Sequence, residues 1–243
     1  MSESDMPKII GYSTIGALLG VIGGTIVIGL LLPGLPLLGL ISRLFNWLFA
    51  LDTVQALWYI TRAAGIIAYL LLWLSTAWGL AVSSKIFDPL LHRAFTYDMH
   101  QFISLVAIGF TILHIVVLFA DQYLPFSVPQ VLIPFIAPYR PIWVGIGIIG
   151  MYLTLLVTVT FYFRRWIGQK TFRVIHLASF LAYAAVTVHG LMAGTDSVLL
   201  ATQLMYAGSA LAIVFLTVYW LVMMLQNKTT APAVANAPVY RRS

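Results

Sequence analysis

Six long apolar segments constrain this chain more than any other feature of its sequence. They cover roughly residues 9–32, 55–83, 97–120, 141–163, 172–193 and 197–225. A helix that crosses a bilayer needs about 20 mostly apolar residues, because backbone groups in hydrocarbon find hydrogen-bond partners only within the protein. The sequence therefore predicts an all-α fold, a polytopic membrane helix bundle with six transmembrane helices.

The composition agrees with this class. Hydrophobic residues make up 61% of the chain and charged residues 8%, whereas soluble domains carry about 25% charged residues. The chain has no cysteine, which excludes disulfides, thiolate metal sites and iron–sulfur clusters. The net charge of +6 fits the loop lysines and arginines of a membrane protein, so we expect contact with membrane lipid and not with nucleic acid.

Two shorter regions flank the main membrane domain, which we place at residues 55–225. Residues 1–54 hold the first span and the segment LPGLPLLGLISRLFNWLFALD, whose prolines and arginine predict a short interfacial helix. Gly16, Gly20 and Gly24 in the first span favour close helix packing, within the bundle or with another subunit. Residues 226–243 are rich in alanine and proline, which predicts a disordered tail.

The loop charges predict an orientation. With a cytoplasmic N-terminus, one side of the membrane holds ten lysines and arginines and the other holds only Arg43 and Arg140. Positive loop charges mark the cytoplasmic side. We therefore expect a multi-pass protein of the cytoplasmic membrane with both termini in the cytoplasm.

Four of the five histidines lie within apolar segments. His100 and His114 are in the third span, and His176 and His189 are in the fifth. Both spans run outward from the cytoplasm, so His100 and His176 share an inner depth, and His114 and His189 share an outer depth. The separations of 14 and 13 residues correspond to about 21 and 20 Å along a helix. Two imidazoles per level predict axial ligation of a haem iron, and two levels predict two haems stacked between the third and fifth helices.

Other interpretations remain open at this point. A single buried histidine is more often a packing residue, although ionisable side chains inside a membrane are functional by default. A zinc or copper site is less favoured, because each level offers two imidazoles and only Asp98 lies near. A proton relay would not need matched depths. Thirteen residues make about 3.6 helical turns, so His189 needs a bulge, a curved helix or a different haem orientation to match His176.

Arg62 is the one lysine or arginine that falls well inside a predicted span, since Arg173 stands at the very start of the fifth. It lies near the outer end of the second span, where its guanidinium can pair with haem propionates. The alternative is an arginine that extends outward to the membrane interface.

These motifs resemble the ferric-reductase-like transmembrane domain family, which includes ferric reductases, NADPH oxidases and the haem-binding subunit of the bacterial periplasmic methionine sulfoxide reductase. The histidine separations of 14 and 13 on the third and fifth of six spans match the family, and FRVIHLASF, TRAAG and HGLMAGTDS are softer matches. Phe172 stands where the family often has tryptophan. Over residues 55–225 the resemblance implies two haem b groups, one held by His100 and His176 and the other by His114 and His189, in a bacterial membrane.

The resemblance also implies a function with partners. Family members often carry a cytoplasmic FAD and nicotinamide domain, but this sequence has no glycine-rich phosphate loop. We therefore expect transmembrane electron transfer from a flavoprotein or a quinol to an acceptor protein or small acceptor outside. Whether the chain is an oxidoreductase in its own right stays open. The alternatives are a structural or assembly subunit of a larger redox complex, and a proton or ion carrier.

Overall fold

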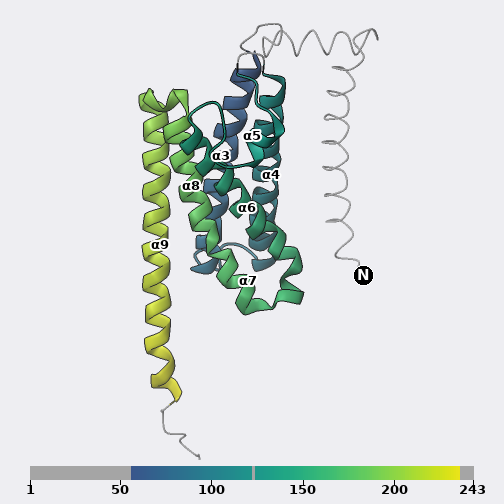
Figure 1. The fold of residues 1–243 in the computed structure, drawn as a ribbon. Coiled ribbons are helices and arrows are strands. Elements are labelled where there is room, and N and C mark those ends of the chain that lie inside the picture. The colour runs from purple at the N-terminus through teal and green to yellow at the C-terminus, as the bar shows by residue number, and fades with distance from the viewer. Residues whose placement is uncertain (1–55, 122–123, 236–243) are drawn as a thin grey trace, which may run out of the picture. The chain divides into compact units, whose positions relative to one another are not determined.

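The computed structural model describes residues 56–121 and 124–235, and these ranges hold helices and no strand (Figure 1). Side chains are described for residues 57–121 and 124–226. The elements, in chain order, are α3 (Ala56–Ser83), α4 (Arg93–Ala120), α5 (Val128–Leu132), α6 (Pro141–Ile167), α7 (Gln169–His176), α8 (Ala178–Ala193), the short 3₁₀ helix η1 (Thr195–Val198) and α9 (Leu200–Ala235). The predicted first span and interfacial helix lie outside the described residues.

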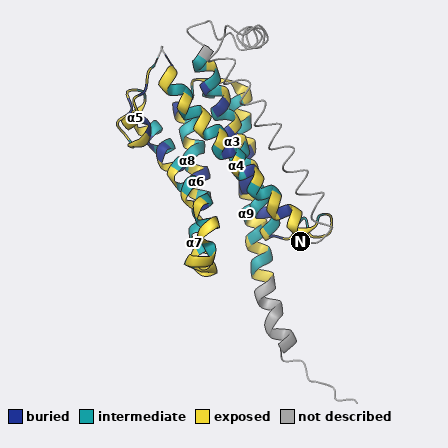
Figure 2. Cartoon of the chain, turned by 90° about the vertical axis from the view of Figure 1, so that its right-hand side faces the viewer, coloured by how far each residue is buried: buried dark blue, intermediate teal, exposed yellow. Residues whose placement is uncertain are grey.

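Five helical segments are long and apolar enough to cross a membrane: Leu57–Ser83, Arg93–Ala120, Pro141–Ile167, Gln169–Ala193 and Leu200–Gln226. They coincide with the second to sixth predicted spans to within about four residues, so the multi-pass membrane class is confirmed. Exposed residues cover the outward faces of the helices (Figure 2). On α9, for example, Leu204, Leu211 and Phe215 are 62–70% exposed. Exposure of such side chains to lipid carries no hydrophobic cost, because lipid tails are as apolar as the side chains.

The turn between α6 and α7 depends on a glycine. Gly168 has φ 82°, and its N–H donates to the carbonyl of Arg164 at the end of α6. Glycine adopts this left-handed conformation without steric cost and commonly ends helices for that reason. After this turn, α7 and α8 run back along α6. The contact between α6 and α8 is the most extensive helix contact in the described part.

The fifth predicted span is divided at Leu177. α7 ends at His176 and α8 begins at Ala178. The Leu177 N–H lies 3.2 Å from the Val174 carbonyl, and the Phe180 N–H lies 3.2 Å from the Leu177 carbonyl. Hydrogen bonds that span three residues tighten a helix and increase the rotation per residue. The Leu177 N–H also lies 3.3 Å from the Arg173 carbonyl, so a regular helical bond is kept beside the tighter one. The fifth predicted span therefore has a local irregularity between His176 and His189, where the 13-residue separation called for one.

The end of α9 differs from the prediction for the tail. We expected disorder from residue 226, but the α9 backbone is helical to Ala235. The ten residues 226–235 continue an already nucleated helix, so propagation needs no new nucleus. The rest of the tail, residues 236–243, lies outside the described residues.

A buried cluster ties α9 to α3 and α8. It contains Tyr69 and Leu80 of α3, Tyr183 of α8, and Tyr206 and Ile213 of α9. The Tyr69 side chain is 2% exposed, and its hydroxyl lies 2.5 Å from the Ser209 hydroxyl and 3.2 Å from the Tyr183 hydroxyl. Buried polar groups in a membrane protein must find such partners internally, so these contacts set the position of α9.

Candidate functional site

The structure brings the four intramembrane histidines together in two pairs. His100 of α4 and His176 of α7 have ring centroids 6.0 Å apart, with ring planes at 70°. His114 of α4 and His189 of α8 have centroids 6.4 Å apart, with planes at 78°. These are the partners that matched depth predicted. From the predicted orientation we name His100 and His176 the inner pair and His114 and His189 the outer pair.

Backbone carbonyls hold both rings of the outer pair. Nδ1 of His114 lies 2.7 Å from the Thr61 carbonyl, and Nδ1 of His189 lies 3.0 Å from the Trp143 carbonyl. A carbonyl oxygen only accepts hydrogen bonds, so each Nδ1 carries the proton and donates. Each Nε2 is then left with a free lone pair. Metal-ligating histidines have this arrangement, because the second hydrogen bond fixes the tautomer and the ring orientation.

Three glycines make room for the rings. A Cβ atom would lie 2.9 Å from the His114 ring at Gly65, 2.6 Å from the His189 ring at Gly147, and 3.1 Å from the His100 ring at Gly79. These glycines were not predicted as part of the site. The available signal was Gly65 and Gly79 in the second predicted span and Gly147 in the fourth, beside the spans that carry the histidines.

The inner pair is held differently. Nδ1 of His100 lies 3.5 Å from the Ser75 hydroxyl, which lies 2.6 Å from the Ser104 hydroxyl. Ser104 donates its one proton to the His100 carbonyl at 2.7 Å, so it accepts from Ser75, and Ser75 accepts from His100. This order again places the proton on Nδ1. His176, by contrast, has a buried Nδ1 with no hydrogen-bond partner among the described residues.

The ring separations fit an iron between each pair. Metal–imidazole bonds are about 2.0–2.1 Å long, so two axial nitrogens lie about 4 Å apart and the ring centroids roughly 6–6.5 Å apart. The separations of 6.0 and 6.4 Å lie in this range. No group of three or more His, Cys, Asp or Glu side chains is gathered as a metal site within the described ranges. Two imidazoles per level are the protein's share of a bis-histidine haem, in which the porphyrin supplies the other ligands.

A cavity of about 570 Å³ adjoins the outer pair. Ligand pockets in proteins span about 300–1,000 Å³. His114, His189 and Arg62 line this cavity together with mostly apolar side chains. Its size suits a large ligand, and its lining is mainly apolar with the charged side chains of Arg62 and Asp196.

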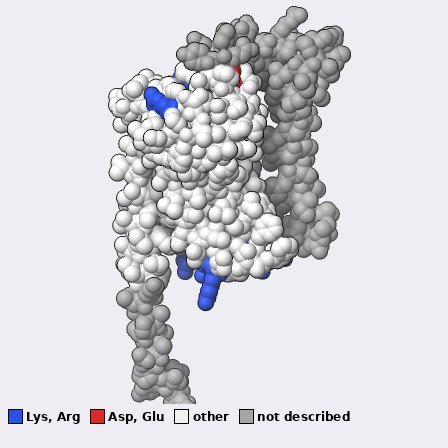
Figure 3. Space-filling view, viewed as in Figure 1, with Lys and Arg blue, Asp and Glu red and all other residues white. Residues whose placement is uncertain are grey.

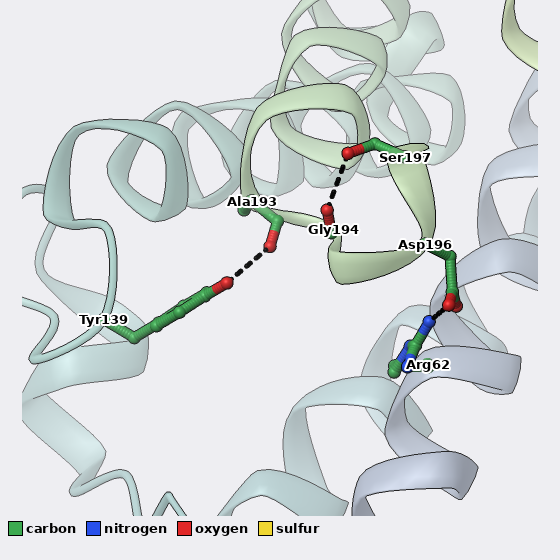
Figure 4. Close-up of polar contacts among 6 residues, drawn as sticks. All are labelled: Arg62, Tyr139, Ala193, Gly194, Asp196 and Ser197. Atoms are coloured by element: carbon green, nitrogen blue, oxygen red, sulfur yellow. Dashed lines mark hydrogen bonds and ion pairs between the residues drawn. The ribbon is translucent and has the colours of Figure 1, made fainter. Parts of the chain in front are cut away.

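Arg62 lines this cavity and forms an ion pair with Asp196 of η1 (Figure 4). Its guanidinium also lies 4.0 Å from the centre of the Trp58 ring. The arginine is therefore held against the bundle and does not extend away from it, as the interfacial alternative required. The sequence analysis missed Asp196 as its partner, although Asp196 belongs to the HGLMAGTDS motif.

Side chains cap the end of α8, one turn beyond His189. The Tyr139 hydroxyl donates to the Ala193 carbonyl at 3.2 Å, and the Ser197 hydroxyl donates to the Gly194 carbonyl at 2.8 Å (Figure 4). Arg140 donates to the Met192 carbonyl at 2.5 Å. The last carbonyls of a helix have no partner within it, so these bonds fix where α8 ends and thereby the height of His189.

The described part therefore defines an all-helical, multi-pass class of membrane protein with two histidine pairs that share helix α4. Comparisons with family models, curated proteins and solved structures give no match for this chain. The assignment of a function consequently rests on the geometry of the two pairs.

Proposed function

We propose that this chain binds two b-type haems and conducts electrons across the membrane, as members of the ferric-reductase-like transmembrane domain family do. One observation carries the proposal: both pairs have ring separations that suit a bis-imidazole iron, 6.0 and 6.4 Å. The two pairs use the same helix, α4, at positions 14 residues apart. This places them about 21 Å apart along the helix, which suits two sites in series across one bilayer.

The chain's own residues would have distinct roles. His100 and His176 would hold the inner haem, and His114 and His189 the outer one, while the haem supplies the one-electron chemistry. The carbonyls of Thr61 and Trp143 keep the outer imidazoles oriented and raise their basicity. The apolar walls exclude water and so influence the reduction potential.

Arg62 would serve the outer haem's propionates. Arg62 lines the cavity, and its guanidinium already pairs with a carboxylate, that of Asp196. A propionate offers the same chemistry, so Arg62 can pair with it beside Asp196 or in its place.

The inner pair lies close to a basic end of the bundle, which supports electron entry there. Arg165, Lys170 and Arg173 are exposed, and Figure 3 shows lysine and arginine gathered at the end where α7 lies. The ring of Phe172 lies 5.2 Å from the His176 ring and 6.2 Å from the Phe161 ring. Two aromatic rings therefore connect the inner pair to the basic end. An acidic flavoprotein is the donor that this charge favours, with a quinol as the other candidate.

The primary test is the haem content of the purified full chain. We expect a b-type reduced-minus-oxidised spectrum at about two haems per chain, as four axial imidazoles require. His100→Ala or His176→Ala should remove one haem, and His114→Ala or His189→Ala the other. His92→Ala is the matched control, because His92 is exposed and lies outside both pairs.

A chain that folds in the membrane fraction but stays colourless would refute this proposal and favour the assembly-subunit alternative. Retention of both haems by any of the four paired-histidine variants would refute the ligand assignment. Electron transfer itself is tested in sealed vesicles, where a reductant on the basic side should reduce an acceptor held on the other side.

A further inference from the structure

The two histidine pairs are not equivalent, because one ring of the four lacks the supports that the other three have. His100, His114 and His189 each place Nδ1 next to an acceptor and each have a glycine against the ring. His176 has no Nδ1 partner among the described residues. No described glycine lies against the His176 ring; the ring lies 5.2 Å from the ring of Phe172, a residue of its own helix.

The backbone around His176 is also the least regular of the four. Helix α7 ends at this residue, and Leu177 interrupts the helix before α8 begins. The neighbouring side chains of Val174 and Leu177 are 70% and 52% exposed, so this turn lies at the surface of the bundle. A side chain beside a helix break at a surface has more freedom to change rotamer than one in a packed helix interior.

These observations all favour the release of His176, and not of the other three histidines, from a bound metal. To leave a metal, an imidazole must rotate, and a ring that donates Nδ1–H to a carbonyl loses that bond when it rotates. His114 and His189 would each lose such a bond, whereas Nδ1 of His176 is buried with no partner among the described residues. Rotation of the His176 ring therefore breaks no hydrogen bond within the described part of the chain.

We propose that the inner haem site is an exchange site, at which a diatomic gas replaces His176 on the iron while His100 stays bound. This inference rests on the proposed function, since it requires haem at the inner pair. The ligand class is a small neutral gas that binds ferrous haem, such as carbon monoxide, nitric oxide or dioxygen. The outer haem keeps both of its imidazoles.

The test uses carbon monoxide as the probe on the dithionite-reduced full-length protein in detergent. We expect carbon monoxide to bind about half of the total haem, with the haem content measured independently. Single-haem variants assign the site. His114→Ala, which keeps the inner haem, should bind carbon monoxide, and His100→Ala, which keeps the outer haem, should not.

A second pair of variants tests the missing hydrogen bond without removing a ligand. Phe172→Asn places an amide oxygen near the His176 ring, and Phe172→Leu removes the aromatic ring without adding an acceptor. We expect the Asn variant to bind carbon monoxide at least about tenfold more weakly than the Leu variant, equivalent to about 1.4 kcal/mol.

The outcomes separate the two proposals. A colourless protein overturns both the haem assignment and the exchange site. If the protein holds two haems per chain, three results overturn the exchange site alone. Carbon monoxide does not bind, or it binds the outer haem, or it binds both haems equally. Equal affinity in the Asn and Leu variants would show that the missing Nδ1 partner is not the cause.

Discussion

Replacing Gly147 with alanine should selectively damage the outer haem site. The added Cβ would lie 2.6 Å from Cγ and Nδ1 of His189 and 3.0 Å from its Cε1. Favourable carbon contacts lie at about 3.5–4.0 Å, so the ring or α6 must move by roughly 1 Å. The movement would act on the 3.0 Å bond from His189 Nδ1 to the Trp143 carbonyl and on the 6.4 Å ring separation.

The expected loss of affinity for the outer haem has two contributions. Overpacking a well-packed site costs about 1–3 kcal/mol, and loss of one hydrogen bond costs about 0.5–1.5 kcal/mol. At about 1.4 kcal/mol per tenfold change, the outer haem should bind about 10- to 1,000-fold more weakly. The inner haem should be retained, because the three atoms nearest to a Cβ at Gly147 all belong to His189 of the outer pair.

The assay is the haem-to-protein ratio of the purified variant, together with a redox titration that resolves the two haems. Gly109→Ala is the matched control, because a Cβ at Gly109 of α4 has no atom within 4 Å. We expect the control to keep two haems and the Gly147 variant to keep about one. A folded Gly147→Ala protein with two haems of unchanged potential would refute the idea that the close contact of Gly147 with the His189 ring is needed for haem binding.

Three further predictions concern the polar contacts around the two pairs. Arg62→Ala should weaken outer haem retention more than Asp196→Asn does, since only the arginine can pair with a propionate; haem loss to apomyoglobin measures both. Ser75→Ala should leave the inner haem in place but raise its midpoint potential by tens of millivolts, because the loss of an acceptor for Nδ1–H lowers imidazole basicity; spectroelectrochemistry measures the shift. Tyr139→Phe removes the hydroxyl that donates to the Ala193 carbonyl and should lower unfolding stability by about 1 kcal/mol, measured by thermal denaturation in detergent.

The sequence by itself determined the membrane class, the described spans and the depth of each histidine. Apolar length sets where a helix crosses a bilayer, and the rise of about 1.5 Å per residue then sets the depth of every side chain on it. These quantities depend only on position along the chain. For that reason His100 and His176 could be matched before any contact between their helices was known, as could His114 and His189. Haem ligation by these residues stays a prediction.

Only the tertiary structure decided what surrounds each ring. Which side chains meet across two helices depends on how each helix is rotated about its axis, and spacing along one helix does not fix that rotation. The contact of Gly147 with His189, the ion pair of Arg62 with Asp196, and the missing partner of His176 therefore could not be read from the sequence. The spacing of His176 and His189 indicated that the fifth span needed an irregularity, but only the structure decided that it is a helix break at Leu177, because local hydrogen bonding sets its place.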